Sequence, residues 1–236
     1  MELELNKKPK NPTIIEGFPG FGLIGTITTE FLIDHLKTEQ IGKIKINELP
    51  AMVAIHDNNV VEPVGLFYNK KYNIVIVHGI VAVKGIEWEL AELIAKLAKD
   101  LNAKEVISLE GVSSATPDKE QKVFFYSSKD TNAKKFEKIG LKKLKEGIIM
   151  GVTGALLVRN RKICSSALFA DTQSNLPDSK ASAKIIEIID KYLNLKVDYK
   201  PLLEQAEKFE SKLKDIMEKS KVAAAEQDKK RESYIG

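Results

Sequence analysis

Residues 14–25 read Ile14-Ile15-Glu16-Gly17-Phe18-Pro19-Gly20-Phe21-Gly22-Leu23-Ile24-Gly25, and an apolar helical pattern follows over residues 26–33. A β-branched run thus meets four glycines and a proline within a few positions. This order predicts a strand, a tight loop and a helix start, which together open a βαβ unit. Because glycine permits positive φ and close backbone approach, we expect this glycine loop to lie in close contact with another group.

The composition limits the class of protein. The chain has 236 residues, of which 43% are hydrophobic and 30% charged, so it can form one large α/β domain or a domain with an appendage. The net charge is only +4, and the lysines alternate with acidic residues. A nucleic-acid-binding domain usually carries a concentrated basic stripe, so no nucleic-acid partner is expected.

Cysteine usage and hydropathy predict a cytoplasmic protein. The single cysteine, Cys164, excludes an internal disulfide and fits a reducing compartment. It lies in the apolar run 163–169, where a buried, unreactive thiol is expected. No apolar run approaches the roughly 18 residues of a membrane span, and the charged start at residues 1–4 is unlike a signal peptide. We therefore expect no membrane partner.

Strands and helices alternate along most of the chain. Amphipathic patterns predict helices from residue 26 to about residue 37 and at residues 85–101, 131–139 and 177–194. Apolar and β-branched runs predict strands at residues 43–46, 51–56, 60–68, 72–78, 106–109, 123–126 and 163–170. This alternation is typical of an α/β fold with a mostly parallel, helix-covered sheet.

Two local features add detail to this prediction. Pro63 favours an edge position for the strand at residues 60–68, because proline cannot donate a ladder hydrogen bond. Residues 151–154 read Gly-Val-Thr-Gly and predict a second glycine loop.

The segment after Pro201 has a different pattern. Its apolar residues alternate spacings of four and three, which is the seam of a heptad helix: Leu202, Ala206, Phe209, Leu213 and Ile216. The sequence therefore predicts two parts, an α/β domain at residues 1–198 and a projecting helical arm with a free tail at residues 199–236.

A nucleotide-binding enzyme is one hypothesis for the loop. Gly20, Gly22 and Gly25 have the spacing of the dinucleotide fingerprint, and Glu48 is placed to supply a ribose-binding acid. However, Phe18-Pro19 lengthens the loop, and Phe21 would compete with a pyrophosphate for space. A nucleoside phosphorylase-like or nucleotide-binding enzyme using residues 17–25 is therefore kept as the alternative function.

Other polar residues give no clear catalytic pattern. His56-Asp57 and His78 follow predicted strands and would meet at the carboxyl edge of the sheet, His35 ends a helix, and Ser113-Ser114 follows another strand. The sequence lacks a His or Cys pair with metal-ligand spacing and a Gly-x-Ser-x-Gly elbow. Structural polar residues are the default interpretation, and neither a metal nor a cofactor is expected.

Four segments carry a family resemblance: residues 17–25, 110–114, 151–157 and 176–183. Together they resemble those of an archaeal member of the PAC2 family of proteasome assembly chaperones. The resemblance extends from about residue 14 to residue 198. It implies a three-layer α/β/α sandwich related in outline to nucleoside phosphorylases and hydrolases, without their enzymatic residues. It also implies homo-oligomers or paired subunits that help to assemble the proteasome core particle.

The resemblance extends to the C-terminal tail. Some members of the family end in a hydrophobic residue, a tyrosine and any residue, and insert this tail between the α-subunits of the core particle. Here Tyr234-Ile235-Gly236 ends the chain, so the tyrosine stands third from the end, and Ser233 precedes it. An aromatic anchor near a terminal carboxylate is suited to docking.

The sequence and the resemblance thus predict a non-enzymatic, ATP-independent proteasome assembly chaperone or adaptor. Its tail contacts core-particle α-subunits, and its body forms a homo-oligomer. The glycine loop is expected to be an oligomer contact or a vestigial ligand site, through Gly17, Phe18, Pro19, Gly20, Phe21, Gly22 and Gly25.

Overall fold

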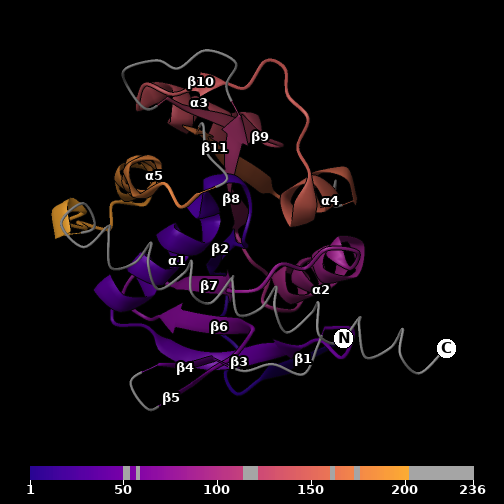
Figure 1. The fold of residues 1–236 in the computed structure, drawn as a ribbon. Helices are drawn as coiled ribbons and strands as arrows, with labels where there is room; N and C mark the ends of the chain where they lie inside the picture. The colour runs from indigo at the N-terminus through magenta and orange to yellow at the C-terminus, as the bar shows by residue number, and fades with distance from the viewer. Residues whose placement is uncertain (50–53, 57–58, 114–121, 160–162, 173–175, 202–236) are drawn as a thin grey trace, which may run out of the picture.

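The computed structural model describes residues 1–49, 54–56, 59–113, 122–159, 163–172 and 176–201. A nine-stranded sheet with the order β1-β3-β6-β7-β2-β8-β11-β9-β10 runs through the molecule (Figure 1). Its strands are β1 (Glu2–Leu5), β2 (Thr13–Gly17), β3 (Glu39–Lys45), β6 (Val64–Asn69), β7 (Ile74–Gly79), β8 (Glu105–Ser113), β9 (Val123–Ser127), β10 (Lys142–Lys143) and β11 (Ser165–Thr172). Strands β4 (Ala54–His56) and β5 (Asn59–Val61) form a separate antiparallel hairpin.

The centre of the sheet is parallel. Strands β7, β2, β8 and β11 run in the same direction, whereas β6 and β9 flank them in the antiparallel sense. Every residue of β7 and of β11 is buried. Burial on both faces is expected of parallel strands that helices cover from both sides.

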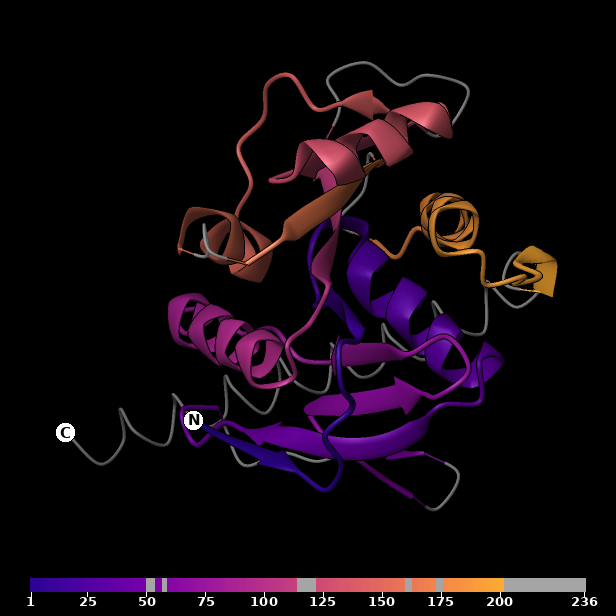
Figure 2. The same ribbon diagram turned by 180° about the vertical axis from the view of Figure 1, so that it is seen from behind.

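Helices form a layer on each face of the sheet. Helices α1 (Ile24–His35), α3 (Asp130–Lys138) and α5 (Ser179–Leu193) contribute to one apolar core, and α2 (Glu87–Asp100) and α4 (Gly151–Arg159) to the other. Figures 1 and 2 show α1 and α5 on one side of the sheet and α2 and α4 on the opposite side. The predicted three-layer α/β/α sandwich with a mostly parallel sheet is confirmed.

Two local predictions are wrong. The second glycine loop is instead the first part of α4, because Val152, Ala155 and Leu156 are buried against the core that contains α2. The strand after Pro63 is not an edge strand, since β6 lies between β3 and β7. Pro63 precedes β6, so its missing N–H removes no ladder bond, and its carbonyl accepts a hydrogen bond from Ile80 N at 3.1 Å.

The ends of the sheet contain strands that the sequence patterns did not reveal. Strand β1 pairs antiparallel with β3, and the two-residue β10 pairs parallel with β9. Most of the predicted helical arm lies outside the described residues, so the division at residue 198 stays a prediction. Among the described residues, no helix combines the length and the apolar character that a membrane span requires.

Candidate functional site

The glycine loop begins at the carboxyl edge of the parallel strands. Gly17, the last residue of β2, is in register with His78 of β7 and Leu109 of β8. The loop therefore starts between two parallel neighbours, at the edge where open α/β sheets usually bind ligands.

Atoms of this same chain pack against the loop. A Cβ added at Gly17 would lie 2.2 Å from the carbonyl oxygen of Gly25, and one added at Gly25 would lie 2.7 Å from that of Leu109. Likewise, a Cβ at Gly79 would lie 2.3 Å from the Phe18 ring, which is buried. The glycines thus allow α1 to approach β2 and β8 closely, a requirement that exists without any ligand.

A left-handed turn joins the loop to α1 and to the start of α5. Gly22 has a φ of 66° and Leu23 a φ of 52°. The backbone N–H of Asp178 donates to the carbonyl oxygen of Gly22 at 2.9 Å, and the Thr172 hydroxyl donates to Asp178 Oδ2 at 2.8 Å. Asp178 also caps α5 by accepting from the Ala181 N–H at 2.9 Å. One aspartate therefore connects the loop, β11 and α5.

Two acidic side chains lie under the loop. Glu16 of β2 is fully buried, and Glu110 of β8 is partly buried. The Thr153 hydroxyl, in the first turn of α4, lies 3.3 Å from a carboxyl oxygen of each. The sequence analysis missed this pair, although an acidic residue inside an apolar strand is a visible signal in both Ile15-Glu16 and Leu109-Glu110.

The environment of the pair favours protonated carboxyl groups. Burial raises the pKa of Glu16 to about 7, although hydrogen bonds from Ser108 and Thr153 act in the opposite direction. Burial, together with the nearby charge of Glu16, raises the pKa of Glu110 to about 8. The two groups titrate as a coupled pair near neutral pH.

The pair is covered by the loop. A Cβ at Gly20 would lie 2.1 Å from Glu110 Oε1, so the loop backbone packs directly against this carboxyl group. Within the described part of the chain, no cluster of three His, Cys, Asp or Glu side chains could hold a metal ion. Through their shared contact with Thr153, the two carboxyl groups form a polar link between β2, β8 and α4 under the loop.

The histidines lie in separate environments. His78 Nδ1 lies 2.8 Å from the Thr29 hydroxyl, and its Nε2 lies 2.9 Å from a Glu30 carboxyl oxygen. His35 stacks on Phe31 with ring centroids 5.3 Å apart. His56 is on β4, but the predicted meeting of its side chain with Asp57 and His78 lies outside what the structure describes.

The other candidate residues also lie apart. Glu48 follows β3, which is separated from β2 by β6 and β7, or about 14 Å at the usual strand spacing. Glu48 lies 3.3 Å from the Met1 amine, and the distance of its strand from β2 argues against its predicted ribose-binding role. Cys164 is partly exposed rather than buried, and partial burial raises the pKa of its thiol. Ser113 ends β8, and Ser114 lies outside the described residues.

The proposed contact residues of the loop differ in exposure. Phe18 is buried in the protein's own core, Pro19 and Phe21 are partly exposed, and Gly20 is exposed. An oligomer contact or a vestigial ligand site at this loop stays a prediction. Tyr234, Ile235 and Gly236 lie outside the described residues.

The structure brings together the four segments that carry the family resemblance. Glu110 and Thr153 represent two of them and contact one another, and Asp178 of the third bonds to Gly22 of the glycine loop. Segments that are far apart in sequence thus form one packed cluster at the carboxyl edge. The glycine loop, the most specific of the four segments, therefore contacts residues 110–114 and 176–183 directly, and residues 151–157 join the cluster through Glu110.

Comparisons with known proteins agree with this arrangement. The profile of the PAC2 family matches residues 14–217. The crystal structure of Pyrococcus furiosus PbaA, described as an archaeal homolog of proteasome-assembly chaperone, is 31% identical, covering 94% of this chain and 99% of that chain at a TM-score of 0.85.

Two further relatives extend the comparison. The Methanocaldococcus jannaschii protein MJ0106 is 29% identical over 96% of this chain and 94% of its own length. Pyrococcus furiosus PbaB, described as an archaeal proteasome activator, is 21% identical to this chain. The match covers 91% of this chain and 98% of the PbaB chain at a TM-score of 0.76, which shows that the two share a fold. From the profile match and the likeness to PbaA, we conclude that the chain belongs to the PAC2 family.

Proposed function

We propose that this protein is a non-enzymatic, ATP-independent proteasome assembly chaperone or adaptor. The observation that carries the proposal is the likeness to PbaA, which extends over nearly the whole of both chains at 31% identity. The PAC2 family match over residues 14–217 supports the same function. The partner is the proteasome core particle, and the contact is made with its α-subunits.

The packing of the glycine loop favours this function over the enzyme alternative. Atoms of α1, of β8 and of the Phe18 ring occupy the space beside Gly17, Gly25 and Gly79, where a phosphate-binding loop would leave room for its ligand. A thermal-shift panel of nucleosides, phosphate, NAD and ATP tests the alternative. We expect each ligand to change the melting temperature of the G22A variant and of the wild type by the same amount. A ligand that raises the melting temperature of the wild type but not that of G22A would instead favour an enzyme that uses this loop.

The tail supplies the docking element in this proposal. Tyr234 provides an aromatic anchor, and several such tails on one oligomer would bind with added avidity. Co-purification with α-subunits should be lost when residues 233–236 are deleted and in the Y234A variant. The matched S233A variant should keep binding. If the deleted protein still captures α-subunits, the tail has no part in docking.

Self-association is proposed to use the body. Exposed apolar side chains occur on α2 (Trp88), just before α4 (Ile148 and Met150) and on α4 (Val158). Exposed apolar groups on neighbouring helices are typical of protein contact surfaces. Light scattering of the double variant W88S/M150S should report a smaller mass than the wild type. A K145S variant, which changes an exposed residue near Ile148, should leave the mass unchanged.

A further inference from the structure

A pocket lies at the opposite edge of the sheet from the glycine loop. Thr13, Ile74 and Glu105 are the first residues of β2, β7 and β8, and Thr13 is in register with both of the others. These amino ends face α3 and the end of α5 across a cavity of about 330 Å³. Small-molecule sites usually occupy about 300–1,000 Å³, so the cavity is large enough for a small ligand.

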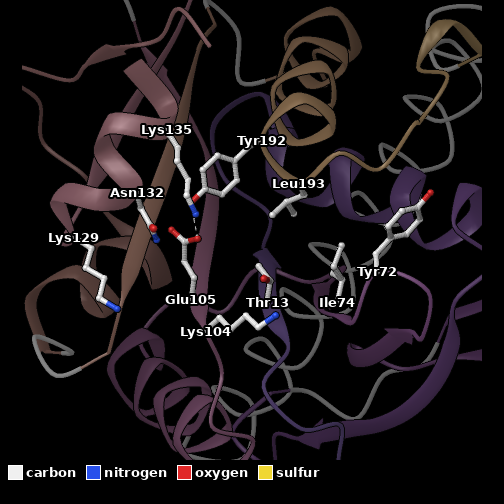
Figure 3. A pocket seen from close by; sticks show the side chains of 10 residues that line it. All are labelled: Thr13, Tyr72, Ile74, Lys104, Glu105, Lys129, Asn132, Lys135, Tyr192 and Leu193. Carbon is white, nitrogen blue, oxygen red and sulfur yellow. Dashed lines mark hydrogen bonds between the residues drawn. The ribbon is translucent and has the colours of Figure 1, made fainter. Parts of the chain in front are cut away.

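Three lysines give the pocket a positive charge. Lys104, Lys129 and Lys135 line it, and none of them forms an ion pair within the residues that the structure describes. Figure 3 shows Lys135 reaching toward Glu105, with Lys129 and Lys104 on either side. The lining contains three ammonium groups and one carboxylate, that of Glu105, so its formal charge is +2.

The single carboxylate is already engaged by hydroxyl groups. Glu105 is only 5% exposed, and one of its oxygens accepts a hydrogen bond from Tyr192 Oη at 2.8 Å. The Ser166 hydroxyl donates to the other oxygen. Among the described residues neither Glu105 nor another acidic side chain lies within ion-pair distance of the three lysines, so their ammonium groups remain available to a ligand.

Fixed side chains form one wall of the pocket. The Tyr192 ring stacks on Phe136 with centroids 4.0 Å apart, and Lys135 Nζ lies 5.9 Å from the centre of the Tyr192 ring. The rest of the lining is neutral polar or apolar: Thr13, Asn132, Tyr72, Ile74 and Leu193. The pocket therefore suits a ligand with both an anionic and an organic part.

From this arrangement we infer that the pocket binds a small organic phosphate monoester. A phosphate monoester carries between about −1.5 and −2 charges at neutral pH, which matches the formal charge of the lining. Lys104, Lys129 and Lys135 contact the phosphate oxygens, and the apolar wall contacts the organic group. The inference is independent of the proposed proteasome function, because it uses neither the tail nor the glycine loop.

Titration calorimetry of the full chain tests the inference. The probes are glycerol 2-phosphate, ribose 5-phosphate, inorganic phosphate and uncharged glycerol. Saturable binding of both esters, tighter than that of inorganic phosphate, is the expected result. Equal affinity for the esters and for inorganic phosphate would contradict the proposed contact between the pocket and the organic group. If neither the esters nor inorganic phosphate bind, the proposed site is wrong.

Charge variants locate the binding. Because a hydrogen bond to a charged group contributes about 1.5–3 kcal/mol, K104Q and K135Q should each weaken ester binding about tenfold or more. The matched K145Q variant removes an exposed lysine outside the pocket and should bind like the wild type. Equal weakening by K145Q would mean non-specific attraction to surface charge and would contradict the proposal.

A glutamine variant of Glu105 gives a second readout. E105Q removes the only negative charge of the lining at nearly constant shape, so it should tighten ester binding severalfold. Weaker ester binding by a folded E105Q protein would contradict a site that holds the phosphate through the net positive charge of its lining. The capture of proteasome α-subunits should be unchanged in K104Q, K135Q and E105Q, which separates the failure of this inference from the failure of the proposed function.

Discussion

The two edges of the parallel sheet use their polar residues in opposite ways. At the carboxyl edge the glycine loop packs so closely that added Cβ atoms would overlap with Gly25, Glu110 and the Phe18 ring. At the amino edge a cavity of about 330 Å³ stays open among lysines. The conspicuous motif therefore serves close packing, whereas the inconspicuous residues Lys104 and Lys135 form the open site. A glycine-rich loop indicates close approach, and only the structure shows which atoms approach it.

The largest expected effect comes from filling the contact between β2 and α1. In G17A the new methyl group would lie 2.2 Å from a backbone oxygen, which cannot move without shifting α1. We expect a loss of about 3 kcal/mol or more in the free energy of unfolding, measured in urea. In the control variant G147A the methyl group would meet only side-chain atoms, of Leu144 at 3.2 Å and of Ile149 at 3.9 Å, so the loss should stay below about 1 kcal/mol. Equal losses would mean that the contact between the loop and α1 has no special role.

The acid pair should make stability depend on pH. Glu16 titrates near 4.5 when unfolded and at about 7 when folded, so between these values the folded state binds more protons. Stability should therefore be greatest below about pH 4.5 and fall as the pH rises through 7. At about 1.4 kcal/mol per unit of pKa shift, Glu16 contributes a decrease of about 3 kcal/mol.

Denaturation curves between pH 5 and pH 9 measure this decrease. E16Q cannot ionise, so its stability should change much less over this range and exceed that of the wild type at pH 9. E110Q should act in the same direction, because burial and Glu16 also raise the pKa of Glu110. The exposed control E146Q should keep the wild-type slope. A wild-type protein as stable at pH 9 as at pH 5 would show that the pair is hydrated rather than buried.

The smallest expected effect concerns the wall of the open pocket. Y192F removes the hydroxyl that donates to Glu105 but keeps the ring stacked on Phe136. Since a buried carboxylate loses one donor, we expect a loss of about 2 kcal/mol in the free energy of unfolding. Burial and the Glu105 charge also raise the pKa of the Tyr192 hydroxyl, so this loss should be the same at pH 6 and pH 9. The Y126F control removes an exposed hydroxyl and should change stability by less than about 0.5 kcal/mol.

Strong local patterns made much of the fold predictable. The strands β2, β7, β8 and β11 correspond to apolar, β-branched runs, and α2 and α5 follow clear helical periodicity. Helix α4 was missed because Gly151 and Gly154 weaken the local helical preference, and burial of Val152 and Leu156 compensates for it. Strand β1 was missed because its sequence, Glu-Leu-Glu-Leu, is short and half charged, and it is stabilised by tertiary contacts: pairing with β3 and packing of Leu3 and Leu5 against the core that contains α2.

The amino-acid sequence by itself determined the α/β class, the layered sandwich and the family, because these depend on periodicity and on motifs that are local in the chain. The tertiary structure alone decided which distant residues meet. It placed Glu16 and Glu110 beside the same Thr153 hydroxyl, and it gathered Lys104, Lys129 and Lys135 around one cavity. The physical reason is that strand order and helix packing bring these residues together, and neither leaves a periodic signal in the sequence.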